Sequence, residues 1–341
     1  MRLCRGEQNS SLYYIEETHY SERMIANMSK ASALVDVSKK RVNPFKELWT
    51  NKFLYLLALP AVVYTFIFSY LTLPYIVIAF EKFNYKTGVF SPFVGLKNFE
   101  YFFKSSWAWT VTRNTLVINI LFLIVGTVCS VVLAIVLNEV KAKKFLKVSQ
   151  SMMLFPYFIS WVIASNIFLT FLSGDGLINK ILLALHVTDE PILFFQKGPY
   201  FWWIIALANT WKNMGYNAII YLAAISGIDA ELYEAAEVDG ANRLQRIWHI
   251  TLPALRPQIG ILLILAIGGI LNTGFEQQLL MGNNAILNYS DVLDTYAYRY
   301  GMKNGMYSYG TAVGLFKSAV SFILVLAANK ITAKLNDSAL F

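Results

Sequence analysis

Charged residues and cysteines are both scarce in this chain. Of its 341 residues only 15% are charged, whereas 56% are hydrophobic. Ordinary soluble domains carry about 25% charged residues, so this composition is typical of a membrane protein. The two cysteines are Cys4, in a polar amino-terminal segment, and Cys129, inside a long apolar run, so no disulfide between them is expected.

The signatures of several enzyme classes are also missing. The sequence has no Gly-x-x-x-x-Gly-Lys-Ser/Thr loop, so we expect it to bind no ATP phosphates of its own. It has no His-Glu-x-x-His helix, no Gly-x-Ser-x-Gly turn and no paired membrane aspartates. Its three histidines are scattered, and no zinc or haem spacing exists. We therefore predict a non-catalytic chain that holds no metal and no cofactor.

Long apolar runs predict an all-α membrane protein, because about 20 apolar residues suffice for a helix to cross a bilayer. Six such runs are predicted as spans, at about 53–80, 115–139, 151–173, 200–226, 258–280 and 309–333. Pro60 and Pro74 suggest that the first run is kinked. The basic loop at 141–147 favours a cytoplasmic side for both termini. The expected organisation is a tail at 1–50, a membrane domain at 51–335 and a short tail at 336–341.

The amino-terminal 50 residues are polar, and no short apolar core precedes a small-residue cleavage site. We expect no cleavable signal peptide, and we expect the first span to direct membrane insertion. Met24 and Met28 are further possible starts, and our hypothesis that the natural chain starts at Met28 is tested by its intact mass. The net charge of +8 fits membrane orientation and lipid contact, and we expect no nucleic-acid partner.

A hydrophilic segment at 227–257 separates two apolar runs. Helical spacing places Leu232, Ala235 and Ala236 on one side, with Glu234 and Glu237 turned away. Such an amphipathic segment, flanked by membrane spans, indicates a partner on the cytoplasmic side.

This helix is expected to end at Gly240, which adopts a positive φ at little cost. A second short helix follows at 244–248, and Pro253 and Pro257 are expected to break it before the next span. Two short helices joined at an angle would form a rigid knob.

Glu234-Ala-Ala, Gly240 and Ile250-x-Leu-Pro253 together resemble the EAA motif of bacterial ABC importer permeases. In that family the motif is the coupling loop that docks on a cytoplasmic ATPase. The resemblance implies that the contact is formed by Glu234, Ala235, Ala236, Asp239, Gly240, Ala241, Ile250, Leu252 and Pro253.

Further motifs resemble the carbohydrate permeases of the MalF and UgpA type. The stretch at 93–99 is similar to one in sugar permeases, and those at 274–277, 291–296, 312–317 and 328–330 are similar to the polysaccharide-type, LplB-like branch. The resemblance runs from about residue 45 to the end. It implies a type I ABC importer permease fold with six transmembrane helices in a bacterial cytoplasmic membrane. It also implies a second homologous permease, two ATP-binding cassette ATPase subunits that bind ATP and Mg²⁺, and an extracellular solute-binding lipoprotein.

The expected function is import of an oligosaccharide or polysaccharide fragment by alternating access, and the alternative is import of a non-sugar solute. A cation-coupled carrier would need no ATPase, and an intramembrane enzyme lacks its motifs here. The sequence does not say which glycan is carried.

Polar side chains inside predicted spans are costly and indicate either a pathway or a buried partner. Candidates for a substrate pathway, all of a chemistry suited to sugars, are Trp161, Asn166, Lys212, Asn272, Glu276 and Gln277. Helix-to-helix hydrogen bonding is the alternative. An ion pair between Glu276 and Lys317 is a further hypothesis, and Gly310 and Gly314 are expected to permit close helix approach.

Overall fold

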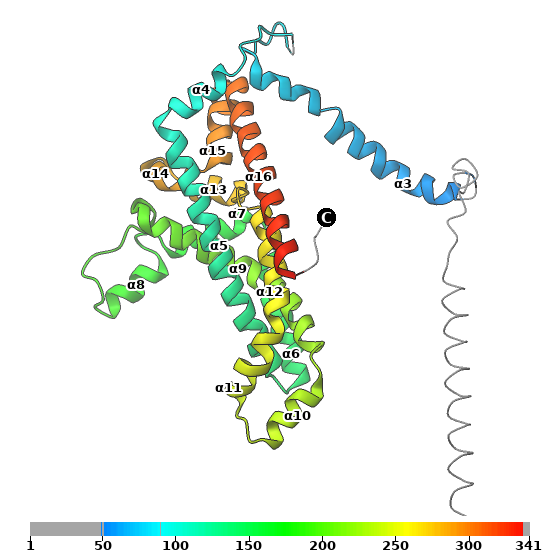
Figure 1. Ribbon diagram of the computed structural model, residues 1–341. Helices are drawn as coiled ribbons and strands as arrows, with labels where there is room; N and C mark the ends of the chain where they lie inside the picture. Colours follow the sequence, from blue (N-terminus) through cyan, green and yellow to red (C-terminus); the bar gives the residue numbers. More distant parts are fainter. Residues whose placement is uncertain (1–48, 50, 89, 337–341) are drawn as a thin grey trace, which may run out of the picture. The chain divides into compact units, whose positions relative to one another are not determined.

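Helices make up almost all of the described structure, a computed structural model that covers residues 49, 51–88 and 90–336, with side chains up to residue 330 (Figure 1). Within these residues the only β-pairings are isolated bridges between Glu81 and Phe93 and between Asn84 and Gly88. The all-α prediction is confirmed. The predicted tails, and with them the Met28 hypothesis, lie essentially outside the described residues.

The chain forms two units, residues 1–73 and 74–341. In the first unit, α3 (Lys52–Thr65) is followed directly by the π-helix η1 (Phe66–Tyr70). Pro60 lies inside α3, and the departure from α-geometry comes at η1. The first predicted span then continues as the 3₁₀-helix η2 (Leu73–Phe80), which contains Pro74, so this span is not one straight α-helix.

Two long helices, α5 (Ser106–Asn138) and α9 (Gly198–Ser226), pack along each other and organise the second unit. α12 (Leu252–Gly268) packs against α9 and against α16 (Tyr307–Asn336). Small side chains at Ala134 and Ala218 are fully buried within one core cluster of α5, α9 and α12. In lipid, close packing of small residues helps to hold helices together, because the lipid tails are as apolar as the helices and no hydrophobic effect drives the helices to associate.

The third predicted span, 151–173, is wrong as a single helix. The chain forms α6 (Lys143–Phe158) and α7 (Trp161–Phe171), which are bent by 98° at the break between them. Ser160 is extended and its hydroxyl accepts a hydrogen bond from the N–H of Ile163, so it starts a new helix. Pro156 lies in the last turn of α6, where a helix readily ends.

The fifth predicted span, 258–280, is also wrong as a single helix. α12 ends at Gly268, and a separate short helix, α13 (Phe275–Met281), begins only after a non-helical stretch. Gly274 has a φ of +72°, a conformation that glycine adopts far more easily than other residues. The apolar composition of the run conceals this backbone break.

By length and composition, four helices in the described residues are able to cross a membrane, or up to five if α6 and α7 form one broken span. The four are Lys52–Phe80, Ser106–Asn138, Arg243–Gly268 and Tyr307–Lys330. α9 is long enough but contains Lys212 and several asparagines, which lower its hydropathy. The total of six membrane crossings and the cytoplasmic termini therefore stay predictions.

Short helices connect the long ones. They are α4 (Lys97–Lys104), α8 (Leu177–Ala184), η3 (Phe194–Gln196), α10 (Ala230–Val238), α11 (Arg243–Arg246), η4 (Ile247–Thr251), η5 (Asn284–Ile286), α14 (Leu287–Ser290), α15 (Leu293–Tyr298) and η6 (Arg299–Lys303). The predicted close approach on α16 holds at Gly310, where a Cβ would meet the Cα of Gly301 at 2.6 Å. The predicted close approach is wrong at Gly314, where an added Cβ would meet no atom within 4 Å.

At Gly215, α9 approaches the backbone of α6 closely. A Cβ there would lie 1.9 Å from the carbonyl oxygen of Met153, so Gly215→Ala must push the two helices apart. We expect a loss of stability of about 1–3 kcal/mol, as for an overpacked core. The measurement is the thermal unfolding midpoint of the purified protein in detergent. Gly314→Ala is the control, and equal midpoints for the two variants would contradict the packing.

Candidate functional site

The hydrophilic segment folds as the predicted pair of short helices. The side chain of Asp229 accepts a hydrogen bond from the N–H of Glu231 at 3.0 Å and so caps the start of α10. Gly240 has a φ of +77°, and the N–H of Ala241 donates to the carbonyl of Ala236 at 2.8 Å. This is the hydrogen bond that closes a helix after a left-handed residue, so the predicted helix end at Gly240 is confirmed.

The second short helix begins with a reciprocal cap. The N–H of Gln245 donates to the side chain of Asn242 at 3.0 Å, and the N–H of Asn242 donates back to the Gln245 side chain at 2.7 Å. α11 then continues through the π-helix η4 into α12, so residues 243–268 are one continuous helix.

The predicted break at the two prolines is wrong. Pro253 lies in the first turn of α12, and Pro257 lies inside the helix. A proline lacks the N–H that an α-helix interior needs. The π-helix η4, which lies before Pro253, has a different hydrogen-bond spacing, and the helix continues through it.

Two contacts tie these helices into one body. The hydroxyls of Tyr233 in α10 and Thr251 in η4 lie 2.9 Å apart, and Thr251 is buried. Arg246 donates to the carboxylate of Glu237 at 3.0 Å. The ion pair is largely exposed on the Glu237 side, so its contribution is at most about 1 kcal/mol. We call the unit formed by α10, α11 and η4 the helical knob.

A groove of about 340 Å³ opens on the helical knob. It is lined by Ala236, Asp239, Gly240, Ala241, Gln245, Arg246, His249 and Ile250. Five of the residues predicted to contact a partner are among them. Glu234 and Ala235 are exposed outside the groove, Leu252 packs against the core cluster of α5, α9 and α12, and Pro253 is half-buried.

Apolar side chains on the helical knob are strongly exposed and were not predicted as contacts. Val238 is 88% exposed and Trp248 is 64% exposed, and Leu232 and Leu244 are also more than half exposed. Several large exposed apolar side chains on one small unit are typical of an interaction site. Their signal in the sequence was weak, because single exposed apolar residues are ordinary.

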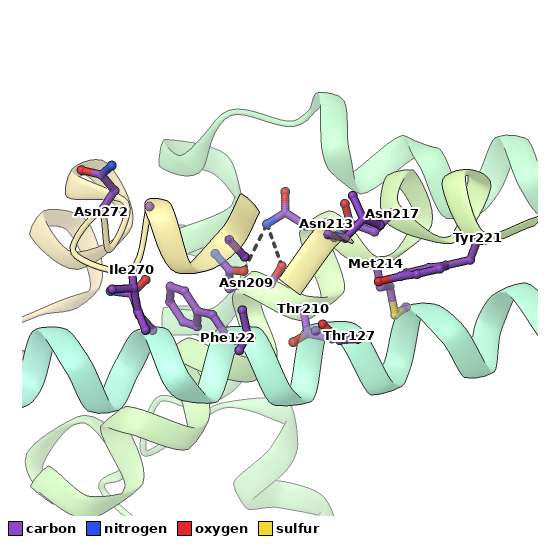
Figure 2. A pocket seen from close by; sticks show the side chains of 16 residues that line it. Phe122, Thr127, Asn209, Thr210, Asn213, Met214, Asn217, Tyr221, Ile270 and Asn272 are labelled. Atoms are coloured by element: carbon purple, nitrogen blue, oxygen red, sulfur yellow. Dashed lines mark hydrogen bonds between the residues drawn. The ribbon is translucent and has the colours of Figure 1, made fainter. Parts of the chain in front are cut away.

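A second candidate site is a cavity of about 380 Å³ between α5, α9 and the end of α12 (Figure 2). Asn209, Asn213 and Asn217 lie four residues apart along α9 and therefore share one face of that helix. Figure 2 shows hydrogen bonds from the Asn213 amide to Asn209. The four-residue spacing of asparagines in an apolar run was a signal that sequence reasoning missed.

Of the six residues predicted for a substrate pathway, the structure places only Asn272 in the lining of this cavity. Gln277 is fully buried behind it, donating to the carbonyl of Ile205 at 2.8 Å and accepting from Asn209 at 3.1 Å. Asn166 and Glu276 are exposed outside the cavity. Gln277 therefore does not line the cavity, but its hydrogen bond orients the side-chain amide of Asn209, which does.

Lys212 does not face the cavity. Its ammonium donates to the backbone carbonyl oxygens at the end of α6, those of Pro156, Tyr157 and Ile159. The rings of Tyr157 and Trp161 lie 5.8 and 5.5 Å from the same nitrogen. Lys212 and Trp161 thus stabilise the break between α6 and α7, because a cation at a helix carboxyl end satisfies its unpaired carbonyls.

The predicted Glu276–Lys317 pair is wrong. Lys317 donates to Asp294 at 2.6 Å, and both partners are mostly buried. Nearby, Arg299 pairs with the buried carboxylate of Asp291. Burial raises the pKa of Asp291, and hydrogen bonds from Thr295 and Arg299 act in the opposite direction. These ion pairs fasten the segment between α13 and α16.

The family comparison agrees with this arrangement. The chain belongs to the family described as "Binding-protein-dependent transport system inner membrane component", which matches residues 126–336. The resemblance to importer permeases is therefore confirmed, and the chain is a multi-pass membrane protein.

Two relatives from Bacillus subtilis (strain 168) match along nearly their whole length. The protein LplB is 40% identical over 92% of this chain and 98% of its own. The polygalacturonan/rhamnogalacturonan transport system permease protein YteP is 38% identical over 93% of this chain and 98% of its own.

A solved structure has the same fold. It is a bacterial ABC transporter involved in the import of the acidic polysaccharide alginate, and its matching chain is 34% identical, with a TM-score of 0.77. The match covers 86% of this chain and 99% of that chain.

The interpretation of Lys212 is tested by Lys212→Met. Removing the ammonium leaves the carbonyls of Tyr157 and Ile159 without their donor, so we expect a loss of about 1–3 kcal/mol in stability. Thermal unfolding measures it, with Lys197→Met as the control, since Lys197 is exposed just before α9. An unchanged midpoint together with a changed preference among transported solutes would contradict the structural role and return Lys212 to the substrate pathway.

Proposed function

We propose that this chain is the permease subunit of an ATP-driven carbohydrate importer and that its helical knob docks on a cytoplasmic ATPase. The observation that carries the proposal is the exposed groove and apolar surface of the knob, on a chain of the importer permease family. Permeases named for oligosaccharides and polysaccharides among the relatives support a carbohydrate substrate.

In this proposal the chain is non-catalytic. Two ATPase subunits bind ATP and Mg²⁺ and hydrolyse the nucleotide, a second homologous permease completes the membrane pathway, and an extracellular solute-binding lipoprotein delivers the sugar. Another similar solved structure is a bacterial alginate ABC transporter in complex with an alginate pentasaccharide-bound periplasmic protein, and it supports such a delivery partner.

Continuity of the helix at 243–268 suggests how ATP would drive transport. The helical knob passes into α12 without a break, and the far end of α12 contributes Leu262 and Ala266 to the cavity. A displacement of the knob by the ATPase pair would therefore move one wall of the cavity directly. Alternating access follows if the two permeases rotate together as the ATPases close.

The cavity is the proposed place where this subunit contacts its substrate. A volume of about 380 Å³ lies within the range of small-molecule sites, roughly 300–1,000 Å³. Amides and hydroxyls from α5, α9 and the residues after α12 offer donors and acceptors to sugar hydroxyls. Import of a non-sugar solute is the second candidate, and a glycerol-3-phosphate permease that is 30% identical over 52% of this chain favours it.

Ala236→Trp tests the docking site. An indole at this position would fill the groove that Ala236 lines, so we expect retention of the ATPase on the purified permease to fall at least tenfold and ATP-dependent uptake of labelled oligosaccharides to be lost. The control is Ala230→Trp, on the same helix but outside the groove.

Normal ATPase retention and uptake in Ala236→Trp would contradict docking at the groove. If uptake by the unmodified assembly does not depend on ATP, the importer proposal is overturned and a carrier or channel is indicated.

A further inference from the structure

The cavity between α5, α9 and the end of α12 contains many polar side chains but no charged one. Its sixteen lining residues include five asparagines and two threonines, and none of the sixteen is Asp, Glu, Lys, Arg or His. An amide both donates and accepts hydrogen bonds while remaining neutral. The lining is therefore suited to groups that also donate and accept without charge.

Internal hydrogen bonds orient several of these amides. The side-chain nitrogen of Asn213 donates to the backbone oxygen of Asn209 at 2.9 Å and to its side-chain oxygen at 3.3 Å. Asn119 donates to the carbonyl of Thr115 at 2.8 Å. Among the described residues no group donates to the side-chain oxygens of Asn213 and Asn119, so each oxygen is free to accept a hydrogen bond from a sugar hydroxyl.

Lys212 lies on the same helix as three of these asparagines, but its ammonium makes its contacts outside the cavity. Lys212 is the one charged residue of α9, and its ammonium is held by the carbonyl oxygens at the end of α6. It does not line the cavity. A carboxylate or phosphate that entered would lose its hydration without gaining an opposite charge from this chain, which is strongly unfavourable.

The remaining lining provides surfaces for the apolar part of a sugar. Phe122 lines the cavity from α5 and is half-buried, whereas Tyr221, also drawn in Figure 2, is buried in the core cluster of α5, α9 and α12. Aromatic faces pack against the C–H side of a ring while amides bind its hydroxyls.

We propose that this cavity binds an uncharged, hydroxyl-rich part of the carbohydrate and selects against sugars that carry a carboxylate or phosphate. The inference rests on the proposed function, because it assigns a substrate class to the same cavity.

The test compares a labelled neutral pentasaccharide with the matched pentasaccharide whose C6 hydroxymethyl groups are oxidised to carboxylates. Binding of each is measured to the purified assembly of this chain, its second permease and its ATPase in nanodiscs. The solute-binding protein is left out, so that its own selectivity does not contribute. We expect the neutral sugar to bind at least tenfold more tightly.

Two variants sharpen the comparison. Asn217 lines the cavity, and its side chain makes no hydrogen bond to other described residues, so Asn217→Lys adds a cation without removing a structural contact. We expect it to shift the affinity ratio at least tenfold toward the carboxylated sugar. Asn138→Lys adds the same charge at the exposed end of α5, outside the cavity, and should leave the ratio unchanged.

Equal or tighter binding of the carboxylated sugar by the unmodified assembly would overturn the inference while leaving the importer proposal intact. Absence of binding to both sugars, in an assembly that still imports carbohydrate with ATP, would also overturn it. A failure of ATP-dependent uptake for every carbohydrate tested, with the solute-binding protein restored, would instead overturn the proposed function.

Discussion

Every polar group that is placed in an apolar medium must find a partner, and this requirement explains the least regular parts of the structure. Where α6 stops inside an apolar run, the carbonyls of Tyr157 and Ile159 have no backbone donor among the described residues, and Lys212 donates to both from α9. The same helix carries Gly215, which lets α9 lie directly against α6. Irregular backbone at membrane depth is tolerated only where protein groups satisfy it.

This constraint also separates two roles that look alike in a sequence. A lysine and an asparagine in a membrane helix both suggest a pathway, since both are costly there. On α9 the lysine faces a neighbouring helix and satisfies backbone carbonyls, whereas the asparagines face the cavity. Different faces of one helix therefore carry the polar group that satisfies backbone carbonyls and the polar groups that line the cavity.

The elements predicted correctly are those that depend on neighbours in the sequence. The end of α10 at Gly240 and the short helix after it follow from local backbone preferences, which motif and spacing report directly. The breaks after Phe158 and Gly268 were missed, because the average hydropathy of a run says nothing about a serine cap or a glycine at positive φ. The partners of Lys212 lie 53 to 56 residues earlier in the chain, and those of Lys317 lie 23 residues away, so no local pattern identifies them.

An amide lining has a physical advantage over a charged one for a cavity that must be filled and emptied repeatedly. A charged group in the membrane interior needs a permanent partner, as Lys212 and Lys317 illustrate, and such a partner competes with any solute. Side-chain amides satisfy one another at modest cost, as those of Asn209, Asn213 and Gln277 do, and still leave hydrogen-bonding capacity toward the cavity. In the proposed cycle, binding that rests on several neutral hydrogen bonds would be weak enough per contact for the solute to be released. The choice of amides over charges thus suits transport, where a tightly held solute would stop the cycle.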